Sequence, residues 1–361
     1  MRSDPPFPND IPTHPLLVID YELVKNGDKT ELERLWTAGT TLGFWYLKNH
    51  GVNEEEVDGM FDVGAETVAL PLEEKMKYEQ GDDGLSFGYK AAGANVVDAA
   101  GTKDNTQFIN IATDDALAWP DTARRTYPSS VNARMASTIA PFVEKSLAVN
   151  DTLIDAFNEK LGLPRGALLN LHPRHEFSGS ATRITYSPPR LDHDVRTAIS
   201  AHTDFGSMTF LHNRLGGLQV LVPGAEEWQY VKPIPGHAIC NIGDAMVIFS
   251  GGILRSNIHR VVNPPGAQGS FDRYSLVYFT RPADTVILRA LRDDSDLIAE
   301  AVAQSSESQK FDTGVTALEW LTRRVKNRRA ANQKARVIPT QKGEGEAWLK
   351  SGGTEHTTRA L

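Results

Sequence analysis

Residues 197–222, TAISAHTDFGSMTFLHNRLGGLQVLV, contain three short segments rich in β-favouring residues, separated by Asp, Gly and Asn. Segments of a few residues bounded by turn-forming residues are typical of antiparallel strands. The same pattern continues in both directions along the chain and predicts strands over 182–187, 197–202, 207–212, 217–222, 228–232, 237–241, 245–249, 257–262 and 273–280. About eight strands in one continuous run favour a double-sheet jelly roll.

Helical patterns flank this run of strands on both sides. Before it, residues 129–161 repeat apolar side chains at helical spacing. After it, Thr316 and Glu319 form a capping-box pattern at the start of a helix over 316–336. We therefore predict a mixed α/β (α+β) protein in four parts: a flexible lead-in over 1–14, a mainly helical region over 15–180, a jelly-roll catalytic core over 181–285, and a helical extension with a tail over 286–361.

The composition favours a globular protein that acts on small molecules. The 361 residues include 38 basic and 46 acidic side chains, and a net charge of −8 does not attract nucleic acid or anionic lipid. Because Cys240 is the single cysteine, a bound metal would need His, Asp or Glu ligands. On such an acidic chain we expect one basic cluster to be a solvated helix face: Arg323, Arg324, Lys326, Arg328 and Arg329.

Two of the predicted strands carry side chains that bind metals. Since side chains alternate along a strand, His202 and Asp204 point to the same side of theirs. His259 follows far enough along the chain for the backbone to cross the jelly roll and return beside them. Two imidazoles and one carboxylate are the ligand set of a facial triad, which suits Fe(II) because it leaves open positions. A single histidine in a strand is more often a packed residue than a metal ligand. The metal site therefore needs support from residues on another strand.

The last predicted strand places a cation in an apolar interior. Alternation puts Arg273 and Ser275 on one face together with Val277 and Phe279. Burying an unpaired guanidinium is costly, so its partner is a carboxylate, which could arrive with a ligand that also binds the metal. A protein carboxylate is the alternative partner, either Asp272 or Asp244.

Taken together, these residues resemble the Fe(II)/2-oxoglutarate-dependent dioxygenase family, in its isopenicillin N synthase-like branch. The resemblance covers roughly residues 15–285. It rests on the following segments: Gly43-Phe44, Asn49-His50-Gly51-Val52, Leu70-Pro71-Leu72-Glu73-Glu74-Lys75-Met76, Gly88-Tyr89, Leu161-Gly162-Leu163-Pro164, His202-Thr203-Asp204, Gly216-Gly217-Leu218-Gln219-Val220, Asn241-Ile242-Gly243-Asp244, Ser256-Asn257-Ile258-His259-Arg260-Val261-Val262 and Arg273-Tyr274-Ser275.

The resemblance implies a double-stranded β-helix, a cupin-like variant of the jelly roll, flanked by helices. It also implies that His202, Asp204 and His259 bind Fe(II), and that Arg273 and Ser275 hold the distal carboxylate of the cosubstrate 2-oxoglutarate. The implied reaction uses O2 to hydroxylate, desaturate or cyclise a small organic molecule at a C–H bond, with release of succinate and CO2. By analogy, we expect such a reaction in secondary metabolism.

One segment departs from the family pattern. Where many relatives carry an Asn and a Tyr before a proline, this chain has Thr185-Tyr186-Ser187-Pro188, and alternation turns Tyr186 away from the interior. Ser187 would need a water to reach the cosubstrate. The candidate contacts to the cosubstrate or the pocket are therefore Thr185, Ser187, Met208, Phe210, Leu218, Val220 and Phe279.

Three other functions use the same residues. An Fe(II) oxidase of the same branch would use Arg273 and Ser275 for the carboxylate of its own substrate instead of 2-oxoglutarate. A zinc hydrolase could share the ligands but needs a general base, and a binding protein would not need the complete set. The sequence has neither a secretory signal pattern nor a long apolar span, so we expect a cytoplasmic protein without membrane contact, and a monomer.

Overall fold

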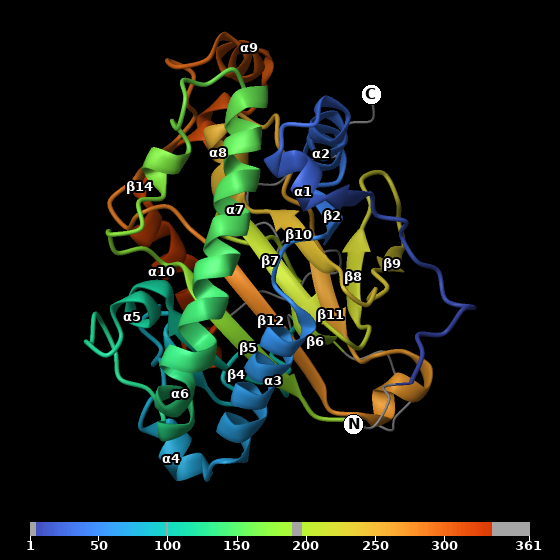
Figure 1. Ribbon diagram of the computed structural model, residues 1–361, viewed down its shortest axis with the longest axis vertical. Helices are drawn as coiled ribbons and strands as arrows, with labels where there is room; N and C mark the ends of the chain where they lie inside the picture. The colour runs from blue at the N-terminus through green and yellow to red at the C-terminus, as the bar shows by residue number, and fades with distance from the viewer. Residues whose placement is uncertain (1–4, 99, 190–196, 334–361) are drawn as a thin grey trace.

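The computed structural model describes residues 5–98, 100–189 and 197–333, and two sheets form its centre (Figure 1). The larger sheet has eight strands in the order β1-β2-β10-β7-β12-β5-β4-β3, and the smaller has four in the order β6-β11-β8-β9. The strands of the larger sheet are β1 (Val18–Asp20), β2 (Phe44–Lys48), β3 (Gly88–Lys90), β4 (Gln107–Ala112), β5 (Ala181–Ser187), β7 (Met208–Asn213), β10 (Ala238–Ile242) and β12 (Arg273–Thr280). Those of the smaller sheet are β6 (Thr197–His202), β8 (Leu218–Leu221), β9 (Trp228–Tyr230) and β11 (His259–Val262). A separate pair is formed by β13 (Ile287–Arg289) and β14 (Asp312–Thr316).

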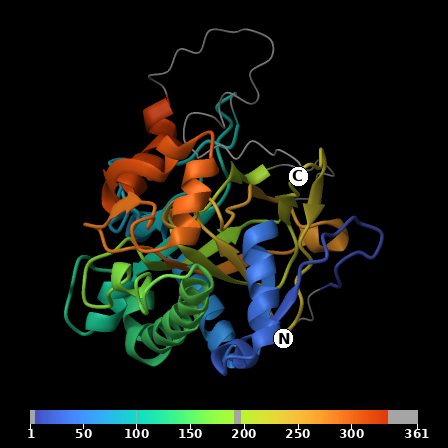
Figure 2. The ribbon, with the colours of Figure 1, turned by 90° about the horizontal axis from the view of Figure 1, so that it is seen from above.

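Helices cover the outer face of the larger sheet (Figure 1). The long helix α7 (Ala140–Lys160) packs against β7 and β12, and α3 (Glu54–Ala69) packs against β12, β5 and β4. Seen from above, α7 and the orange-red C-terminal helices lie on different sides of the strands (Figure 2). The other helices are α1 (Tyr21–Lys25), α2 (Lys29–Thr41), α4 (Leu72–Met76), α5 (Thr113–Ala118), α6 (Ser129–Arg134), α8 (Asp244–Phe249), α9 (Asp296–Gln304), α10 (Ala317–Arg328) and α11 (Ala330–Gln333).

The main hydrophobic core lies between this helical layer and the larger sheet. Phe142 and Phe157 of α7 are fully buried there with Phe210 of β7. A second apolar cluster, which includes Phe44 and Val220, joins the larger sheet to the smaller one. The two sheets are therefore held together by side chains as a jelly-roll core, as the sequence predicts.

The larger sheet does not stop at the predicted boundary near residue 181. Strands β1 to β4 come from the region predicted to be mainly helical, and β4 pairs with β5 along its whole length. The predicted helix over 129–161 is confirmed as α6, a π-helical segment (Met135–Ile139) and α7. The predicted tail beyond residue 333 and the first four residues of the predicted lead-in lie outside the described residues.

The strand predicted over 245–249 is wrong, because these residues form most of helix α8. Every residue of α8 is buried, so its five consecutive apolar residues show neither helical nor strand periodicity. A short apolar run of this kind cannot be assigned from its pattern alone. The helix predicted over 316–336 is also interrupted, since Arg329 adopts an extended conformation between α10 and α11.

Gly43, between α2 and β2, is in a conformation and a place that only glycine fits. Its φ is +74°, and a Cβ there would overlap the backbone carbonyl oxygen of Arg255. We expect Gly43→Ala to lower the free energy of unfolding by about 2–5 kcal/mol, from left-handed strain and overpacking together. Gly27 is the matched control, because its φ is +73° but a Cβ would meet open space. Gly27→Ala should cost only about 1 kcal/mol in urea unfolding, and equal losses in the two variants would contradict this account of Gly43.

Candidate active site

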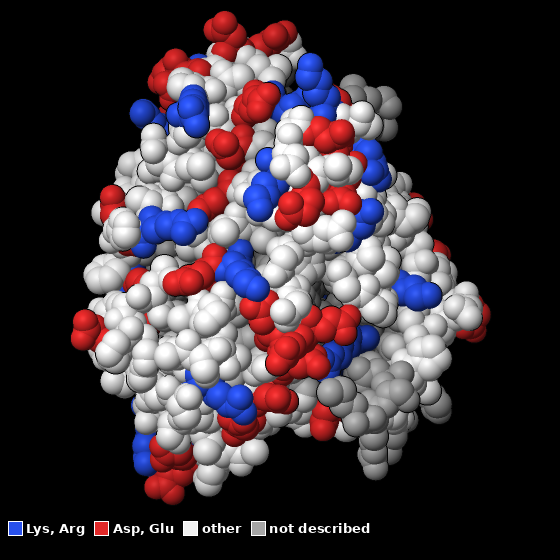
Figure 3. Space-filling model, in the orientation of Figure 1, with Lys and Arg blue, Asp and Glu red and all other residues white. Residues whose placement is uncertain are grey.

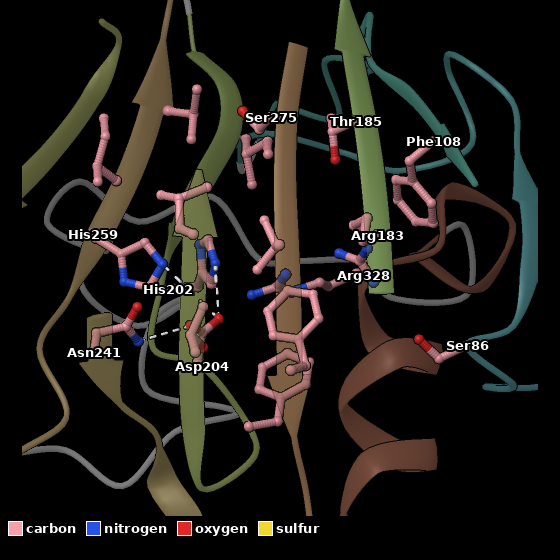
Figure 4. A pocket seen from close by; sticks show the side chains of 18 of the residues that line it. Ser86, Phe108, Arg183, Thr185, His202, Asp204, Asn241, His259, Ser275 and Arg328 are labelled. Atoms are coloured by element: carbon pink, nitrogen blue, oxygen red, sulfur yellow. Dashed lines mark hydrogen bonds and ion pairs between the residues drawn. The ribbon is translucent and has the colours of Figure 1, made fainter. Parts of the chain in front are cut away.

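A cavity of about 120 Å³ lies between the two sheets of the jelly roll, and Figure 4 shows the side chains around it. Strands of the larger sheet supply Thr185, Asn241 and Ser275, and strands of the smaller sheet supply His202 and His259. The cavity is also closed by Phe108 of β4 and by residues outside the two sheets: Gln80, Ser86, Asn95, Val325 and Arg328.

His202, Asp204 and His259 converge on one point in this cavity (Figure 4). His202 ends β6 and pairs in register with His259, the first residue of β11. Asp204 follows two residues after the strand, and its Oδ1 lies 3.8 Å from His202 Nε2 and 3.9 Å from His259 Nε2. One ligand atom from each residue lies within 4.8 Å of the others, a spacing that allows all three to bind one ion.

Both imidazoles, of His202 and His259, are oriented with Nε2 toward the point where the three side chains converge. His202 Nδ1 lies 2.7 Å from the carbonyl oxygen of Ser200, and His259 Nδ1 lies 3.2 Å from that of Asn257. A carbonyl can only accept, so Nδ1 carries the proton and donates it, which leaves the lone pair on Nε2 for a metal. Burial lowers the pKa of His202 well below its usual value, with help from the nearby charges of Arg328 and His259, and this favours the neutral ligand form.

Asp204 is oriented by two hydrogen bonds that the sequence analysis missed. Thr209 Oγ1 donates to its Oδ2 at 2.5 Å, and Asn241 Nδ2 donates to the same oxygen at 2.8 Å, so Oδ1 stays free for a metal. Burial alone would raise the pKa of Asp204, but the imidazoles of His259 and His202 and these two bonds hold it well below its usual range. Asn241 belongs to a segment that carries the family resemblance, and that segment was the available signal for a role in the site. In the structure it lies on β10, which pairs with β7.

We expect Asn241→Ala to weaken Fe(II) binding about 10-fold or more, because the carboxylate loses one of the two donors that fix its rotamer. Equilibrium dialysis under anaerobic conditions measures this affinity directly. Asn213→Ala is the matched control, since Asn213 ends the neighbouring strand β7 and bonds instead to the carbonyl oxygen of Leu215. Equal affinity in the Asn241 variant and the unchanged protein would contradict this role.

Arg273 lines the same cavity and is 2% exposed. Its Nε donates to the carbonyl oxygen of Gly216 at 2.7 Å and its Nη1 donates to Ser275 Oγ at 2.6 Å. Burial lowers the pKa of Arg273 to about 10, and within the described part of the chain no carboxylate forms a salt bridge with it. Both alternative partners are engaged elsewhere, Asp272 with the hydroxyl of Tyr186 and Asp244 with Arg324.

The predicted pocket residues divide between the cavity and the core. The cavity is lined by Thr185, Leu218 and Phe279. Ser187 is not among the lining residues, but it is buried opposite Arg273 in the β5–β12 register, and its Oγ has no hydrogen-bond partner among the described residues. The structure therefore leaves a buried hydroxyl group beside Arg273, while Tyr186 points away as alternation predicts.

Three predicted pocket residues lie elsewhere. Met208 and Phe210 belong to the core under the helices, whereas Thr209 and Leu211 of the same strand face the cavity. The prediction chose the wrong face of β7, because both faces of this central strand carry apolar residues and the pattern does not distinguish them. Val220 packs in the cluster that joins the two sheets.

Three further arginines line the cavity, none of which the sequence analysis assigned to the site. They are Arg183 on β5, Arg281 directly after β12, and Arg328 at the end of α10. The expectation of a solvated basic helix face is wrong for Arg324 and Arg329, which are buried, and for Arg328, which is partly buried. Arg323 and Lys326 are not among the buried residues of this cluster.

The fold and the His202, Asp204 and His259 cluster define a class of protein. It is a jelly-roll protein with two histidines and one carboxylate arranged to bind a metal in its cavity. Comparison with protein families agrees. Residues 178–282 match the model of the 2OG-Fe(II) oxygenase superfamily, and residues 16–131 match the model described as the N-terminal region of the non-haem dioxygenases in morphine synthesis.

The chain is also similar to individual proteins and to solved structures. The chain is 27% identical over 300 residues to a 2-oxoglutarate-dependent dioxygenase of Gibberella zeae, covering 81% of this chain and 87% of that protein. It is 25% identical over 357 residues to a flavone synthase of Petroselinum crispum, covering 94% and 90%. Its fold matches that of a full-length Neurospora crassa protein solved in complex with alpha-KG, with a TM-score of 0.69 at 23% identity over 90% of this chain and 99% of that one.

The chain belongs to the Fe(II)/2-oxoglutarate-dependent dioxygenase family, as the sequence predicts. It is an oxidoreductase that uses Fe(II), 2-oxoglutarate and O2. Among the described helices, none combines the length and the apolar composition needed to cross a membrane.

Proposed function

We propose that His202, Asp204 and His259 are the Fe(II) ligands and that Arg273 and Ser275 bind the distal carboxylate of 2-oxoglutarate. The observation that carries this proposal is the convergence of two Nε2 atoms and one Oδ1 in the cavity that Arg273 also lines. The donor set fits the metal, because each imidazole is held by its Nδ1 and the carboxylate by its Oδ2. Ser187, with its buried free hydroxyl opposite Arg273, is the proposed site of a bridging water to the same carboxylate.

The reaction proposed for this site oxidises a C–H bond of a small organic molecule, as part of secondary metabolism. When bound, Fe(II) activates O2 with 2-oxoglutarate as the co-reductant. One oxygen atom enters the succinate that forms with CO2. The other leaves as the hydroxyl group of the product, or as water when the substrate is desaturated or closes a ring.

The chain itself contributes orientation and the exclusion of water. Arg273 fixes one end of the cosubstrate, so the other end of the cosubstrate is directed toward the proposed metal site. Phe44, Leu211 and Val261 give the cavity apolar walls, and the ring of Phe44 packs against His259 with its centroid 5.3 Å away. These walls limit the access of water to the reacting groups.

The charge distribution supports the same kind of substrate. In Figure 3, Lys and Arg side chains are scattered among Asp and Glu over the face shown, and the whole chain has a net charge of −8. We therefore propose a protein without a nucleic-acid partner, and we propose a cytoplasmic monomer. Asp204 is the one carboxylate among the described residues that line the cavity, which leaves a zinc hydrolase without a second carboxylate as general base.

Oxygen-dependent turnover with purified protein tests this proposal. We expect the protein with Fe(II), ascorbate and 2-oxoglutarate to release succinate, and to release more when a metabolite from a screening panel is a substrate. Replacing Fe(II) with Zn(II) should remove this activity, since Zn(II) has no accessible redox chemistry. Substrate oxidation that proceeds without 2-oxoglutarate would instead support the oxidase alternative.

A further inference from the structure

The cavity holds far more positive than negative charge. Four arginines line it, Arg183, Arg273, Arg281 and Arg328, against the single carboxylate of Asp204 among the described lining residues. Arg273 already has a role in the proposed function. The other three reach the cavity from three different elements, so no single local feature explains why they meet there.

Arg183 is held in place through its Nε, and its two Nη atoms have no hydrogen-bond partner among the described residues. Its Nε donates to Asn110 Oδ1 at 2.7 Å, and Asn110 is itself buried in β4. Its guanidinium carbon lies 4.1 Å from the ring centroid of Phe108 and 5.1 Å from that of Phe279. Aromatic faces hold a guanidinium in position without using its N–H donors, so the two Nη atoms remain available for a ligand.

Arg328 reaches the cavity because α10 is anchored one turn earlier. Arg324 forms a buried salt bridge with Asp244 at the start of α8. Residues four apart lie on the same face of a helix, so Arg328 also faces inward, where its guanidinium carbon lies 4.6 Å from the ring centroid of Phe205. Figure 4 shows the side chains of Arg328 and Arg183 next to one another.

Arg281 completes the group from the end of β12. It is 8% exposed, and its Nη1 donates to the carbonyl oxygen of Gly179. Its buried Nε has no hydrogen-bond partner among the residues that the structure describes. An unpaired buried donor of this kind is costly unless a ligand accepts its hydrogen bond.

The three guanidinium groups also repel one another. Burial lowers the pKa of Arg183 to about 9, and the charges of Arg281 and Arg328 contribute in the same direction. None of the three forms a salt bridge with a carboxylate of residues 5–98, 100–189 or 197–333. Arginine stays protonated in proteins, so the remaining way to relieve this cost is a bound anion.

The proposed cosubstrate does not supply that anion. Fe(II) and Arg273 carry three positive charges, and 2-oxoglutarate and Asp204 carry three negative ones, so this set is already neutral. The charges of Arg183, Arg281 and Arg328 are left for the molecule that is oxidised. The rings of Phe108, Phe205 and Phe279 beside them offer an apolar surface to the rest of it.

We propose that the substrate is a small organic acid with an apolar body, and that Arg183, Arg281 and Arg328 bind its carboxylate. This inference rests on the proposed function, because the acid would be bound beside Fe(II) and 2-oxoglutarate in the same cavity. A planar carboxylate can accept two parallel hydrogen bonds from a guanidinium, which fixes its orientation as well as its position.

Calorimetry without O2 tests the class of the substrate. The protein is loaded with Fe(II) and 2-oxoglutarate and titrated with phenylacetate, with its neutral analogue phenylacetamide, and with phenyl phosphate. We expect phenylacetate to bind about 10-fold tighter than the amide or better, the value of one charge-assisted hydrogen bond. Equal binding of acid and amide, or no binding of the acid, would overturn the proposal. Tighter binding of phenyl phosphate than of phenylacetate would overturn the choice of a carboxylate.

Variants assign the binding to these residues. Arg183→Met and Arg328→Met should each weaken phenylacetate binding about 10-fold while the affinity for 2-oxoglutarate stays unchanged. Arg323→Met is the matched control, since Arg323 lies on the same helix but does not line the cavity. Loss of 2-oxoglutarate affinity in the Arg183 or Arg328 variant would assign these arginines to the cosubstrate and contradict the proposal. Absence of Fe(II) and 2-oxoglutarate binding in the unchanged protein would instead defeat the proposed function.

Discussion

Asp204→Ala should abolish both Fe(II) retention and turnover, with metal affinity reduced by more than about 100-fold. Loss of a residue that merely orients a ligand costs up to about that factor, and Asp204 is itself the one carboxylate of the proposed ligand set. The two imidazoles that remain would be held only by their Nδ1 bonds to Ser200 and Asn257. Metal content after anaerobic dialysis, together with succinate release, measures the effect. His202→Ala should have the same result.

A matched control separates the loss of a ligand from the loss of an imidazole. His237 bonds through Nδ1 to the carbonyl oxygen two residues earlier, at 2.9 Å, as His202 does. It packs against Tyr46 outside the cavity, and so His237→Ala should keep Fe(II) and activity. Full metal content and full activity in either the Asp204 or the His202 variant would contradict the assignment.

The convergence of the two histidines could be predicted from sequence, because it follows from the pairing of two strands. A jelly roll brings the later strand β11 beside β6, where His259 pairs with His202, and Asp204 follows only two residues after the end of β6. The two bonds that orient Asp204 could not be predicted in the same way. They join its carboxylate to β7 and β10, and their formation depends on how the smaller sheet packs on the larger one.

The arginines show where a local pattern was sufficient and where it was not. Arg281 is in phase with Arg273, Ser275 and Phe279 along β12, and Arg183 is in phase with Thr185 on β5, so alternation alone could have placed both. Arg328 is different. Its inward orientation depends on the salt bridge between Arg324 and Asp244, and Asp244 begins a helix that the sequence pattern assigned to a strand.

Which face of β7 lines the cavity depends on tertiary packing, and the sequence pattern does not reveal it. One face of this strand meets α7 and the other meets the cavity, and both faces are partly apolar. A strand buried on both faces loses the alternation of polar and apolar residues that marks an exposed sheet. That Thr209 and Leu211 line the cavity could therefore be seen only in the tertiary structure.

Arg273→Ala should raise the KM for 2-oxoglutarate about 10- to 100-fold, the equivalent of a charge-assisted hydrogen-bonded pair. Arg273→Lys should recover part of this loss, because an ammonium group supplies the charge but not the planar fork. Arg260→Ala is the matched control, since Arg260 follows His259 on β11 but bonds to Gln219 and stacks on Trp228 away from the cavity. Steady-state kinetics with varied 2-oxoglutarate, supported by urea unfolding of each variant, separate a binding defect from a folding defect. An unchanged KM in a folded Arg273→Ala variant would remove the cosubstrate role, and its single bonds to Gly216 and Ser275 would then be purely structural.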